Sequence, residues 1–304
     1  MDTTIQDIRQ AARQLVRELH LLDGRYCIEG FTFSECHLLT ELEFLGQAAA
    51  SELGERLVLE KSTMSRLVNG LLERAYIQSD QDPADRRRRL LYLTRKGRGG
   101  ADRINRYSNQ QVGGALDFVV DGERETIVAG LSRYAKALAY SRISVDYEIR
   151  PVRRKDNPAV ARIIRQVMTE FGAVGCNYSI SDPEVDSMAE AYSAPDSAYF
   201  AIEHKGKVLG CGGMGPLAEG DQGLCEVRKM YLLPELRGTG LGTRLLGMVL
   251  HAAREAGYTR CYLETLEHMS HARYLYLKHG FEFFDAPVGK TGHSACNSWM
   301  IKTL

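Results

Sequence analysis

The sequence predicts a two-domain protein, in which a mostly helical N-terminal domain with one small β hairpin precedes an α/β domain. Three observations support this. The chain has 304 residues, about twice the usual ~100–150 residues of one domain. Helical apolar spacing dominates as far as about residue 142, and strands alternate with helices from Tyr147 onward. We therefore expect one domain over residues 1–143 and a second over 147–304.

The N-terminal half shows its helices through their apolar spacing. Residues 5–22 place apolar side chains on one face, and a second helix is expected behind Ser34 as its N-cap. Further helices are expected at about 48–57, 62–75, 95–118 and 122–141. Between residues 76 and 94, two short strand-like runs flank a charged, proline-containing turn, which predicts a hairpin.

The C-terminal half alternates strands and helices. Strand-like runs stand near residues 148–152, 198–216, 225–233, 261–265, 282–285 and 297–304, and helical runs stand near 158–171, 240–257 and 270–280. The junction at 141–146 is short and not rich in glycine or serine, so we expect the domains to be held close.

Composition limits the possible functions only broadly. Apolar residues make up 44% and charged residues 26%, and the formal net charge is zero. Binding to nucleic acid must therefore depend on local clusters of charge. Seven cysteines without a CxxC pair, no apolar stretch of ~20 residues and a polar N-terminus predict a cytoplasmic protein. Four scattered histidines, His268, His271, His279 and His293, lack ligand spacing, so we expect no metal site.

The most informative stretch joins a strand to an apolar helix through a glycine-rich loop. The loop Arg237–Gly242 has glycine at every second position after Arg237, and the helix behind it begins near Gly240. Glycines allow a ligand to approach the backbone, and a helix N-terminus offers unpaired N–H groups to an anion. The spacing fits neither a Walker A loop nor a dinucleotide-binding fingerprint. A tight turn without a ligand is the alternative.

This stretch resembles motif A of the GNAT acyltransferase superfamily, in which Arg237-x-x-Gly240-x-Gly242 matches in full. A later superfamily motif is present as Ala272-x-x-Leu275-Tyr276 with Gly280-Phe281. The resemblance implies an acetyl-CoA-dependent N-acetyltransferase. It implies that the cofactor is bound by Met230, Tyr231, Leu232, Arg237, Gly238, Thr239, Gly240, Leu241, Gly242 and Thr243.

The same resemblance implies two catalytic residues. Tyr276 stands where many members have a tyrosine that protonates the departing thiolate, and the alternative is a core aromatic side chain. Glu226 lies eleven residues before Arg237, at the spacing of a general-base glutamate in some members, and Glu264 is the competing carboxylate. Met269 replaces an asparagine that often contacts CoA. We expect acceptor specificity to depend on residues 171–188 and 286–297. We expect the acceptor to be a small amine, such as an amino acid or an antibiotic-like compound, with protein lysine as the second choice.

Positive charge is concentrated in the N-terminal half. There, the tip of the predicted hairpin carries Arg86, Arg87, Arg88 and Arg89. Upstream, a helix–turn–helix pattern ends in a polar helix that carries Ser62, Thr63, Ser65, Arg66 and Asn69, which are residue types that contact base edges and phosphates. Residues 5–142 resemble the MarR family of winged helix-turn-helix regulators, through Lys61–Val68, Asp82–Arg87 and Leu93–Gly97. The resemblance implies a DNA operator, a wing at Arg86–Arg89 and a homodimer through residues 5–22 and 95–141.

Three functions therefore remain open. The chain is a bifunctional regulator and acetyltransferase, a regulator whose second domain senses acetyl-CoA or an amine without turnover, or an enzyme whose first half only dimerises.

Overall fold

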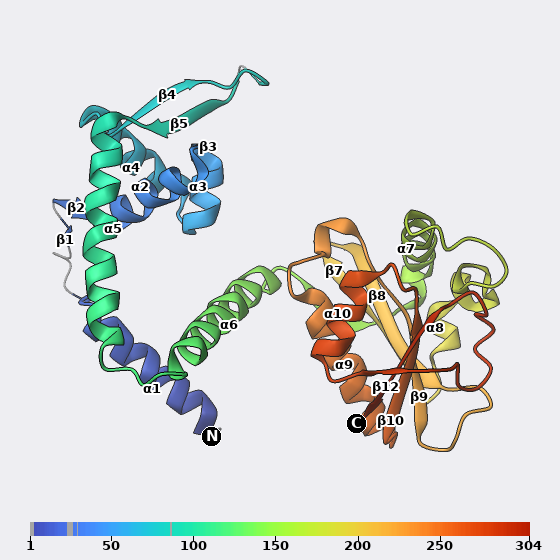
Figure 1. The fold of residues 1–304 in the computed structure, drawn as a ribbon. Helices are drawn as coiled ribbons and strands as arrows, with labels where there is room; N and C mark the ends of the chain where they lie inside the picture. Colours follow the sequence, from blue (N-terminus) through green and yellow to red (C-terminus); the bar gives the residue numbers. More distant parts are fainter. Residues whose placement is uncertain (1–2, 23–26, 29, 86) are drawn as a thin grey trace. The chain divides into compact units, whose positions relative to one another are not determined.

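The computed structural model describes residues 3–22, 27–28, 30–85 and 87–304, and it divides into two compact units, Met1–Thr126 and Ile127–Leu304 (Figure 1). The first is mostly helical and the second is a mixed α/β domain, as the sequence predicts. The boundary falls inside α6 (Glu123–Ser144). The helix therefore includes most of residues 141–146, the junction expected from the sequence.

The first unit is a helical core with a small sheet. Its apolar interior is formed by side chains of α2 (Phe33–Leu45), α3 (Ala50–Leu57), α4 (Lys61–Glu73) and the start of α5 (Arg95–Leu116). The strands β3 (Gln47–Ala49), β5 (Arg89–Leu93) and β4 (Ile77–Gln81) form an antiparallel sheet in that order. Short strands β1 (Cys27–Ile28) and β2 (Phe31–Thr32) pair with each other as a separate two-stranded sheet.

Two helix boundaries differ from the prediction. The N-cap of α2 is Thr32 and not Ser34, because the Thr32 hydroxyl accepts from the Glu35 amide while the Glu35 carboxylate accepts from the Thr32 amide. This reciprocal capping box satisfies two N–H groups at the helix start. The first helix, α1 (Thr3–Glu18), ends before residue 22 and buries none of its side chains within the unit.

The second unit is built on a seven-stranded sheet. Its strand order is β11 (Glu282–Phe284), β12 (Ser298–Thr303), β10 (Arg260–Thr265), β9 (Leu224–Leu232), β8 (Lys207–Pro216), β7 (Ala198–His204) and β6 (Glu148–Pro151). All neighbouring pairs are antiparallel except β9 and β10. This one parallel pair lies in the middle of the sheet.

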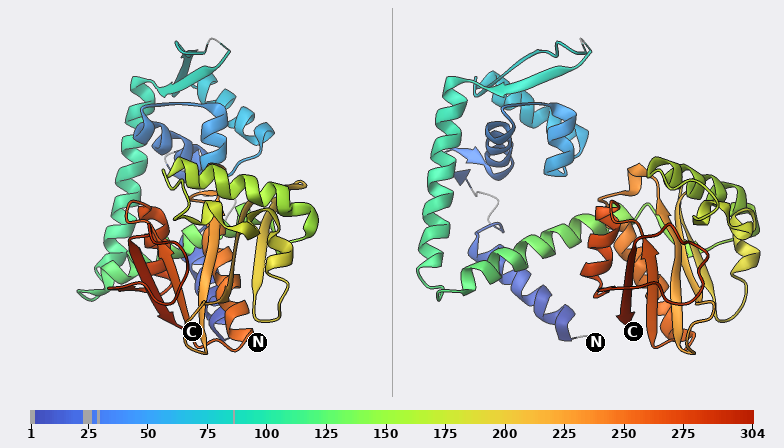
Figure 2. Two further views of the ribbon diagram at one scale, coloured as in Figure 1. Left: turned by 90° about the vertical axis from the view of Figure 1, so that its right-hand side faces the viewer. Right: turned by 45° about the vertical axis from the view of Figure 1, so that its right-hand side comes forward.

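Helices cover the sheet in two layers that can be followed in Figure 2. Leucines of α9 (Leu241–Glu255) and Tyr276 of α10 (Ser270–Lys278) belong to one apolar cluster, and residues of α7 (Asn157–Glu170) and Met188 of α8 (Met188–Ala191) belong to the other. Four short 3-10 turns, at 154–156, 179–181, 183–186 and 234–236, connect these elements. No helix among the described residues is long and apolar enough to span a bilayer.

Candidate active site and nucleic-acid interface

The centre of the large sheet opens where β9 and β10 separate. The two strands pair only from Leu224 to Glu226 against Arg260 to Tyr262, although β9 runs on to Leu232 and β10 to Thr265. Beyond Glu226 the edge of β9 that faces β10 has no ladder partner. A cavity of about 70 Å³ lies there, and both strands line it. Backbone groups of Met230 and Tyr231, two of the predicted cofactor residues, therefore border an opening in the sheet.

A bulge in β9 shapes this opening. The register between β8 and β9 shifts between Cys211 and Gly213, and Lys229 has a left-handed backbone with φ 48°. Left-handed backbone is strained for a residue with a side chain, and such strain concentrates at functional sites. The Tyr199 hydroxyl donates to the Lys229 carbonyl at 2.7 Å and holds the bulge in place.

The predicted phosphate loop follows β9 directly. Gly238 and Gly240 have φ of 76° and 85°, and α9 begins at Leu241 with Gly240 as its N-cap. The first N–H groups of α9 have no partner within the helix; that of Leu241 donates to the Thr239 hydroxyl at 3.4 Å, and those of Gly242 and Thr243 can bind an anion. A Cβ at Gly240 would overlap the ring of Tyr140 from α6. Glycine is therefore needed at residue 240 both for backbone conformation and for space.

Arg237 points away from the loop backbone. Its guanidinium pairs with the Glu170 carboxylate, donates to the Leu232 carbonyl at 3.2 Å and lies 5.4 Å from the centre of the Phe171 ring. The side chain therefore links the loop to the end of α7, which leaves the backbone of the loop as its anion-binding part.

Tyr276 lines the cavity from the helix α10. Its ring packs edge-on against Phe281, and burial raises the pKa of its phenol to about 12. A phenol with this pKa carries its proton at neutral pH, although the rise makes it a weaker acid than an ordinary tyrosine.

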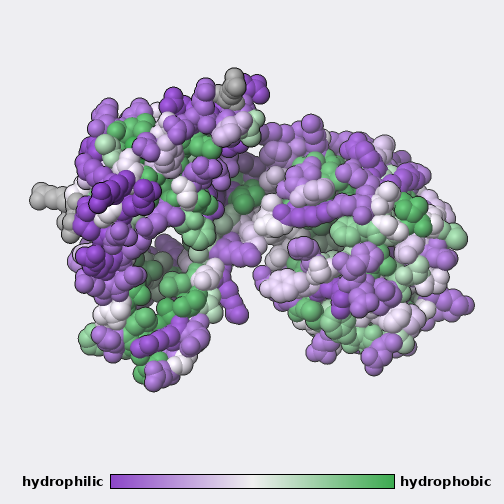
Figure 3. All heavy atoms as spheres, turned by 45° about the horizontal axis from the view of Figure 1, so that its top comes forward, coloured by the Kyte–Doolittle hydropathy of each residue, from purple (hydrophilic) through white to green (hydrophobic). Residues whose placement is uncertain are grey.

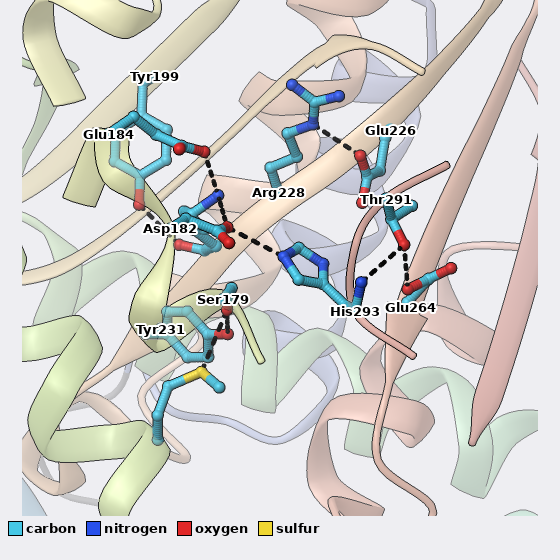
Figure 4. A network of polar contacts seen from close by, with 12 residues as sticks. Ser179, Asp182, Glu184, Tyr199, Glu226, Arg228, Tyr231, Glu264, Thr291 and His293 are labelled. Carbon is cyan, nitrogen blue, oxygen red and sulfur yellow. Dashed lines mark hydrogen bonds and ion pairs between the residues drawn. The ribbon is translucent and has the colours of Figure 1, made fainter. Parts of the chain in front are cut away.

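Two carboxylates of the cavity differ in their partners. Glu226 accepts a bond of 2.6 Å from Arg228 Nε, which gives it a cationic partner. Glu264 accepts from two hydroxyls, each at 2.8 Å, that of Tyr262 and that of Thr291 (Figure 4). Burial raises the pKa of Glu264, and these two hydrogen bonds lower it by less.

A network of ion pairs joins the two segments expected to determine the acceptor (Figure 4). Lys229, with its side chain only 2% exposed, lies 2.7 Å from Asp182 and 2.6 Å from Glu184. Asp182 also lies 2.9 Å from His293 Nε2. Burial opposes ionisation of Asp182, but His293 and Lys229 lower its pKa overall. Sequence reasoning missed Lys229 and Asp182, although a lysine within an apolar strand is the pattern that could have indicated them.

The helix α4 has the character expected of a DNA-reading helix. Ser62, Ser65, Arg66 and Asn69 are exposed and Thr63 is half-buried, whereas Met64, Val68 and Leu71 face the core. The polar face is thus free along the N-terminal part of the helix, where base contacts are made in helix-turn-helix proteins.

The hairpin of β4 and β5 carries the arginine run. Arg87 is exposed and pairs loosely with Asp85 at 3.3 Å, while Arg89 donates to the Ser79 hydroxyl and carbonyl and so braces the hairpin. The side chain of Arg88 is exposed. Arg86 lies outside the described residues. Within those residues, no group of three or more His, Cys, Asp or Glu side chains could hold a metal.

Comparison with known proteins identifies both halves. Residues 162–281 match the model of the acetyltransferase (GNAT) family, and residues 29–88 match that of the MarR family. The uncharacterized N-acetyltransferase YjgM of Escherichia coli is 43% identical over 51% of this chain and 95% of its own length. The chain belongs to the GNAT family and is an acetyl-CoA-dependent acetyltransferase, with a MarR-family region at its N-terminus.

More distant likenesses exist for each half. The IAA acetyltransferase of Azospirillum brasilense is 33% identical over 38% of this chain and 73% of its own length. The putative acetyltransferase yncA of Salmonella typhimurium, solved with its cofactor acetyl-CoA, is 21% identical with a TM-score of 0.43, covering 52% of this chain and 94% of its own. A probable transcriptional regulator of Pseudomonas aeruginosa is 27% identical with a TM-score of 0.36. The match covers 43% of this chain and 96% of that regulator's chain.

Proposed function

We propose that this protein is a bifunctional transcriptional regulator that also transfers an acetyl group from acetyl-CoA to the primary amine of a small molecule. The observation that carries the proposal is the cavity between β9 and β10. Tyr276, two carboxylates and the unpaired edge of β9 all border it, within the same unit as the glycine loop. A sensor without turnover would not need a protonated phenol and a carboxylate together in one cavity.

The residues suit acetyl transfer to an amine in the following way. A carboxylate, Glu226 or Glu264, takes a proton from the acceptor ammonium, because an ammonium has no lone pair with which to attack. Backbone groups of Met230–Leu232 bind the thioester end of the cofactor, and those of Arg237–Thr243 bind its pyrophosphate. The free amine adds to the thioester carbonyl, and the C–S bond then breaks. Tyr276 gives its proton to the departing sulfur, and the second proton of the attacking nitrogen, released as the amide forms, passes to the Tyr276 phenolate.

We propose that the first half binds an operator as a homodimer. Ser62, Thr63, Ser65, Arg66 and Asn69 enter the major groove, and Arg86–Arg89 contact the flanking backbone. Apolar side chains exposed on α1 and α6 support dimerisation, since Ile5 is 53% exposed and Leu131 also 53%. Figure 3 shows apolar residues at the surface of the molecule. The limits 1–143 and 147–304, which assign α6 to the dimerisation domain, remain a prediction.

An assay of free CoA release over a panel of amines tests the enzymatic half. Turnover of at least one amine by the full chain, lost in Tyr276→Phe, is the expected result. No turnover of any amine, combined with operator binding, would favour the sensor that does not catalyse.

Operator selection tests the regulatory half. The expected result is enrichment of a palindromic sequence, bound more tightly than random DNA at raised salt. Equal affinity for selected and random DNA at every salt concentration would leave dimerisation as the role of the first half.

A further inference from the structure

We infer that the acceptor is a small amine that carries a positive charge and no carboxylate, and that the Glu264 carboxylate is both its anchor and the base that deprotonates it. The inference rests on the proposed acetyl transfer and narrows its substrate class. It follows from the partners of the charged side chains around the cavity between β9 and β10.

Most charges that line this cavity already have an opposite charge within the protein. Arg228 pairs with Glu226 at 2.6 Å. Lys229 pairs with both Asp182 and Glu184, and His293 contacts Asp182 from the other side. These groups form two separate sets, the pair of Arg228 with Glu226 and the cluster around Lys229 and Asp182 (Figure 4). An incoming ligand could therefore pair with one of these charged groups only by breaking an existing ion pair.

Glu264 is the exception among the cavity-lining residues that the structure describes. Its two carboxylate oxygens accept from Tyr262 and Thr291, which are neutral donors. No cation forms an ion pair with it, and the nearby His293 is itself bonded to Asp182. A half-buried carboxylate without an ion-pair partner is costly, so a cation that reaches it gains more than the same cation would at the surface. An acceptor ammonium supplies the missing charge.

The same arrangement disfavours an α-amino acid. The carboxylate of an amino acid is attached through a single carbon to the amine, so docking the amine against Glu264 brings the two carboxylates close together. Arg228 and Lys229, the cations that could offset this repulsion, are already paired with internal carboxylates. Like charges placed together in a partly dry site oppose binding strongly.

The apolar residues that line the rest of the cavity determine which uncharged part of an acceptor fits there. Met168, Leu266, Met269, Ala272 and Cys296 line the cavity, whose volume is about 70 Å³. These side chains offer apolar contact to the uncharged part of the acceptor. A short aliphatic amine fits better than a polyamine, whose second charge would meet the apolar wall.

Glu264 is better suited than Glu226 to remove the proton. Taking a proton from the ammonium leaves Glu264 neutral, which removes a half-buried charge that has no ion-pair partner, whereas protonating Glu226 would leave Arg228 without its partner. The proton moves from the ammonium nitrogen to a Glu264 oxygen, and the nitrogen lone pair so released forms the new bond to the acetyl carbon.

Matched pairs of amines test the inference with the full chain. Isopentylamine and leucine, or isobutylamine and valine, share a side chain and differ only in the carboxylate. We expect kcat/KM to favour the carboxylate-free member by on the order of 10²-fold. In Glu264→Gln we expect this preference to fall towards one and kcat/KM for isopentylamine to fall by on the order of 10²-fold. Glu282→Gln, on the exposed strand β11, is the matched control and should change neither.

Binding of the same amines to the CoA-saturated protein, measured by calorimetry, separates the inference from the proposed function. Tighter binding of isopentylamine than of leucine, lost in Glu264→Gln, supports the inference even if no amine is acetylated. Leucine bound or acetylated as well as isopentylamine would overturn it, as would a preference that survives in Glu264→Gln. A circular dichroism spectrum like that of the wild type ensures that loss in the variant is not misfolding.

Discussion

Tyr276 lies where a proton donor to the departing thiolate is expected, since its ring borders the cavity between β9 and β10. Burial raises the pKa of its phenol to about 12, which keeps the phenol protonated but makes it a weaker acid than an ordinary tyrosine. Tyr276→Phe should lower kcat by on the order of 10²-fold with little change in KM, because the lost interaction forms only as the thiolate leaves. Steady-state release of CoA measures both constants. Tyr274→Phe is the control, since Tyr274 is 70% exposed on the same helix and should leave kcat unchanged. An equal loss in both variants would exclude Tyr276 as the acid.

The carboxyl of Glu264 should determine the acidic limb of the pH profile. Burial raises its pKa and nearby Glu226 adds to the rise, while Thr291, Tyr262 and His293 lower it. The base must be ionised, so activity should fall as the pH drops through this raised pKa. Tyr262→Phe removes one donor and should move the acidic limb of kcat/KM to higher pH. If the acidic limb stays at the same pH in Tyr262→Phe, a group other than Glu264 determines it.

The same pKa shift predicts a change in stability with a definite sign. Because the folded pKa of Glu264 is raised, its contribution to stability is most favourable below the ordinary glutamate pKa and is lost as the pH rises through the folded pKa. Glu264→Gln should therefore raise Tm relative to the wild type at pH 8 but not at about pH 4. Thermal unfolding at both pH values measures this, and a Tm gain confined to pH 4 would contradict it.

Among the elements, the bulged strand β9 connects to the acceptor loop through Lys229. Its ammonium holds Asp182 and Glu184, so Lys229→Met would leave two partly buried carboxylates without a cation. We expect the free energy of unfolding to fall by about 3 kcal/mol. Lys290→Met removes an exposed pair with Glu219 and should cost less than about 0.5 kcal/mol. Urea denaturation compares them, and equal losses would show that burial of the pair is unimportant.

The glycine loop allows a second comparison within one element. Gly240→Ala places a side chain at φ 85° and against the Tyr140 ring, so it should raise KM for acetyl-CoA by about tenfold and lower stability. Gly247→Ala, within α9 and in open space, should instead stabilise the protein by about 0.5–1 kcal/mol. Initial rates against acetyl-CoA and thermal unfolding measure the two effects. An unchanged KM for acetyl-CoA in Gly240→Ala would show that the loop does not bind the cofactor.

The elements also explain what the sequence could predict. The loop before α9, the hairpin and the helix α4 lie close to their predicted places. Each is encoded by residues near one another in the sequence, through the spacing of glycines or of apolar side chains. The separation of β9 from β10, the bulge at Lys229 and the pairing of Lys229 with Asp182 depend on contacts between residues far apart in the chain. No local pattern encodes them. The cap at Thr32 was missed because two hydroxyl residues compete within three positions, and only the bond to Glu35 distinguishes them.

For the whole molecule, a formal net charge of zero means that DNA binding depends on a few clustered arginines. Arg66 is exposed on α4, and Arg87 is exposed at the hairpin. Arg87→Ala should weaken binding to all sequences alike and reduce the salt dependence by about one counterion, whereas Arg66→Ala should also relax operator choice by about 1–3 kcal/mol. Fluorescence anisotropy across a salt series distinguishes them. Identical effects on specific and random DNA in both variants would argue against base contact by Arg66.

The helix α6 offers a physical route by which the two activities could influence each other. It runs from Glu123 to Ser144 without interruption, and its Tyr140 ring covers Gly240 in the loop that should bind the cofactor's pyrophosphate. A pyrophosphate bound to this loop must share the space around Gly240 with that ring. The cofactor would therefore bias the position of a helix that continues into the first unit. We predict that acetyl-CoA changes operator affinity by about 5-fold or more.

Operator binding with and without acetyl-CoA tests this coupling in the full chain. Tyr140→Ala should abolish the change in affinity while leaving operator binding itself intact, because the side chain contacts the loop and not DNA. Ser141→Ala, at the next and exposed position of the same helix, should preserve it. By reciprocity, operator DNA should shift the affinity for acetyl-CoA by the same factor. Equal operator affinity with and without acetyl-CoA would mean that the two halves act independently, and the fusion would then serve only to keep the enzyme with its regulator.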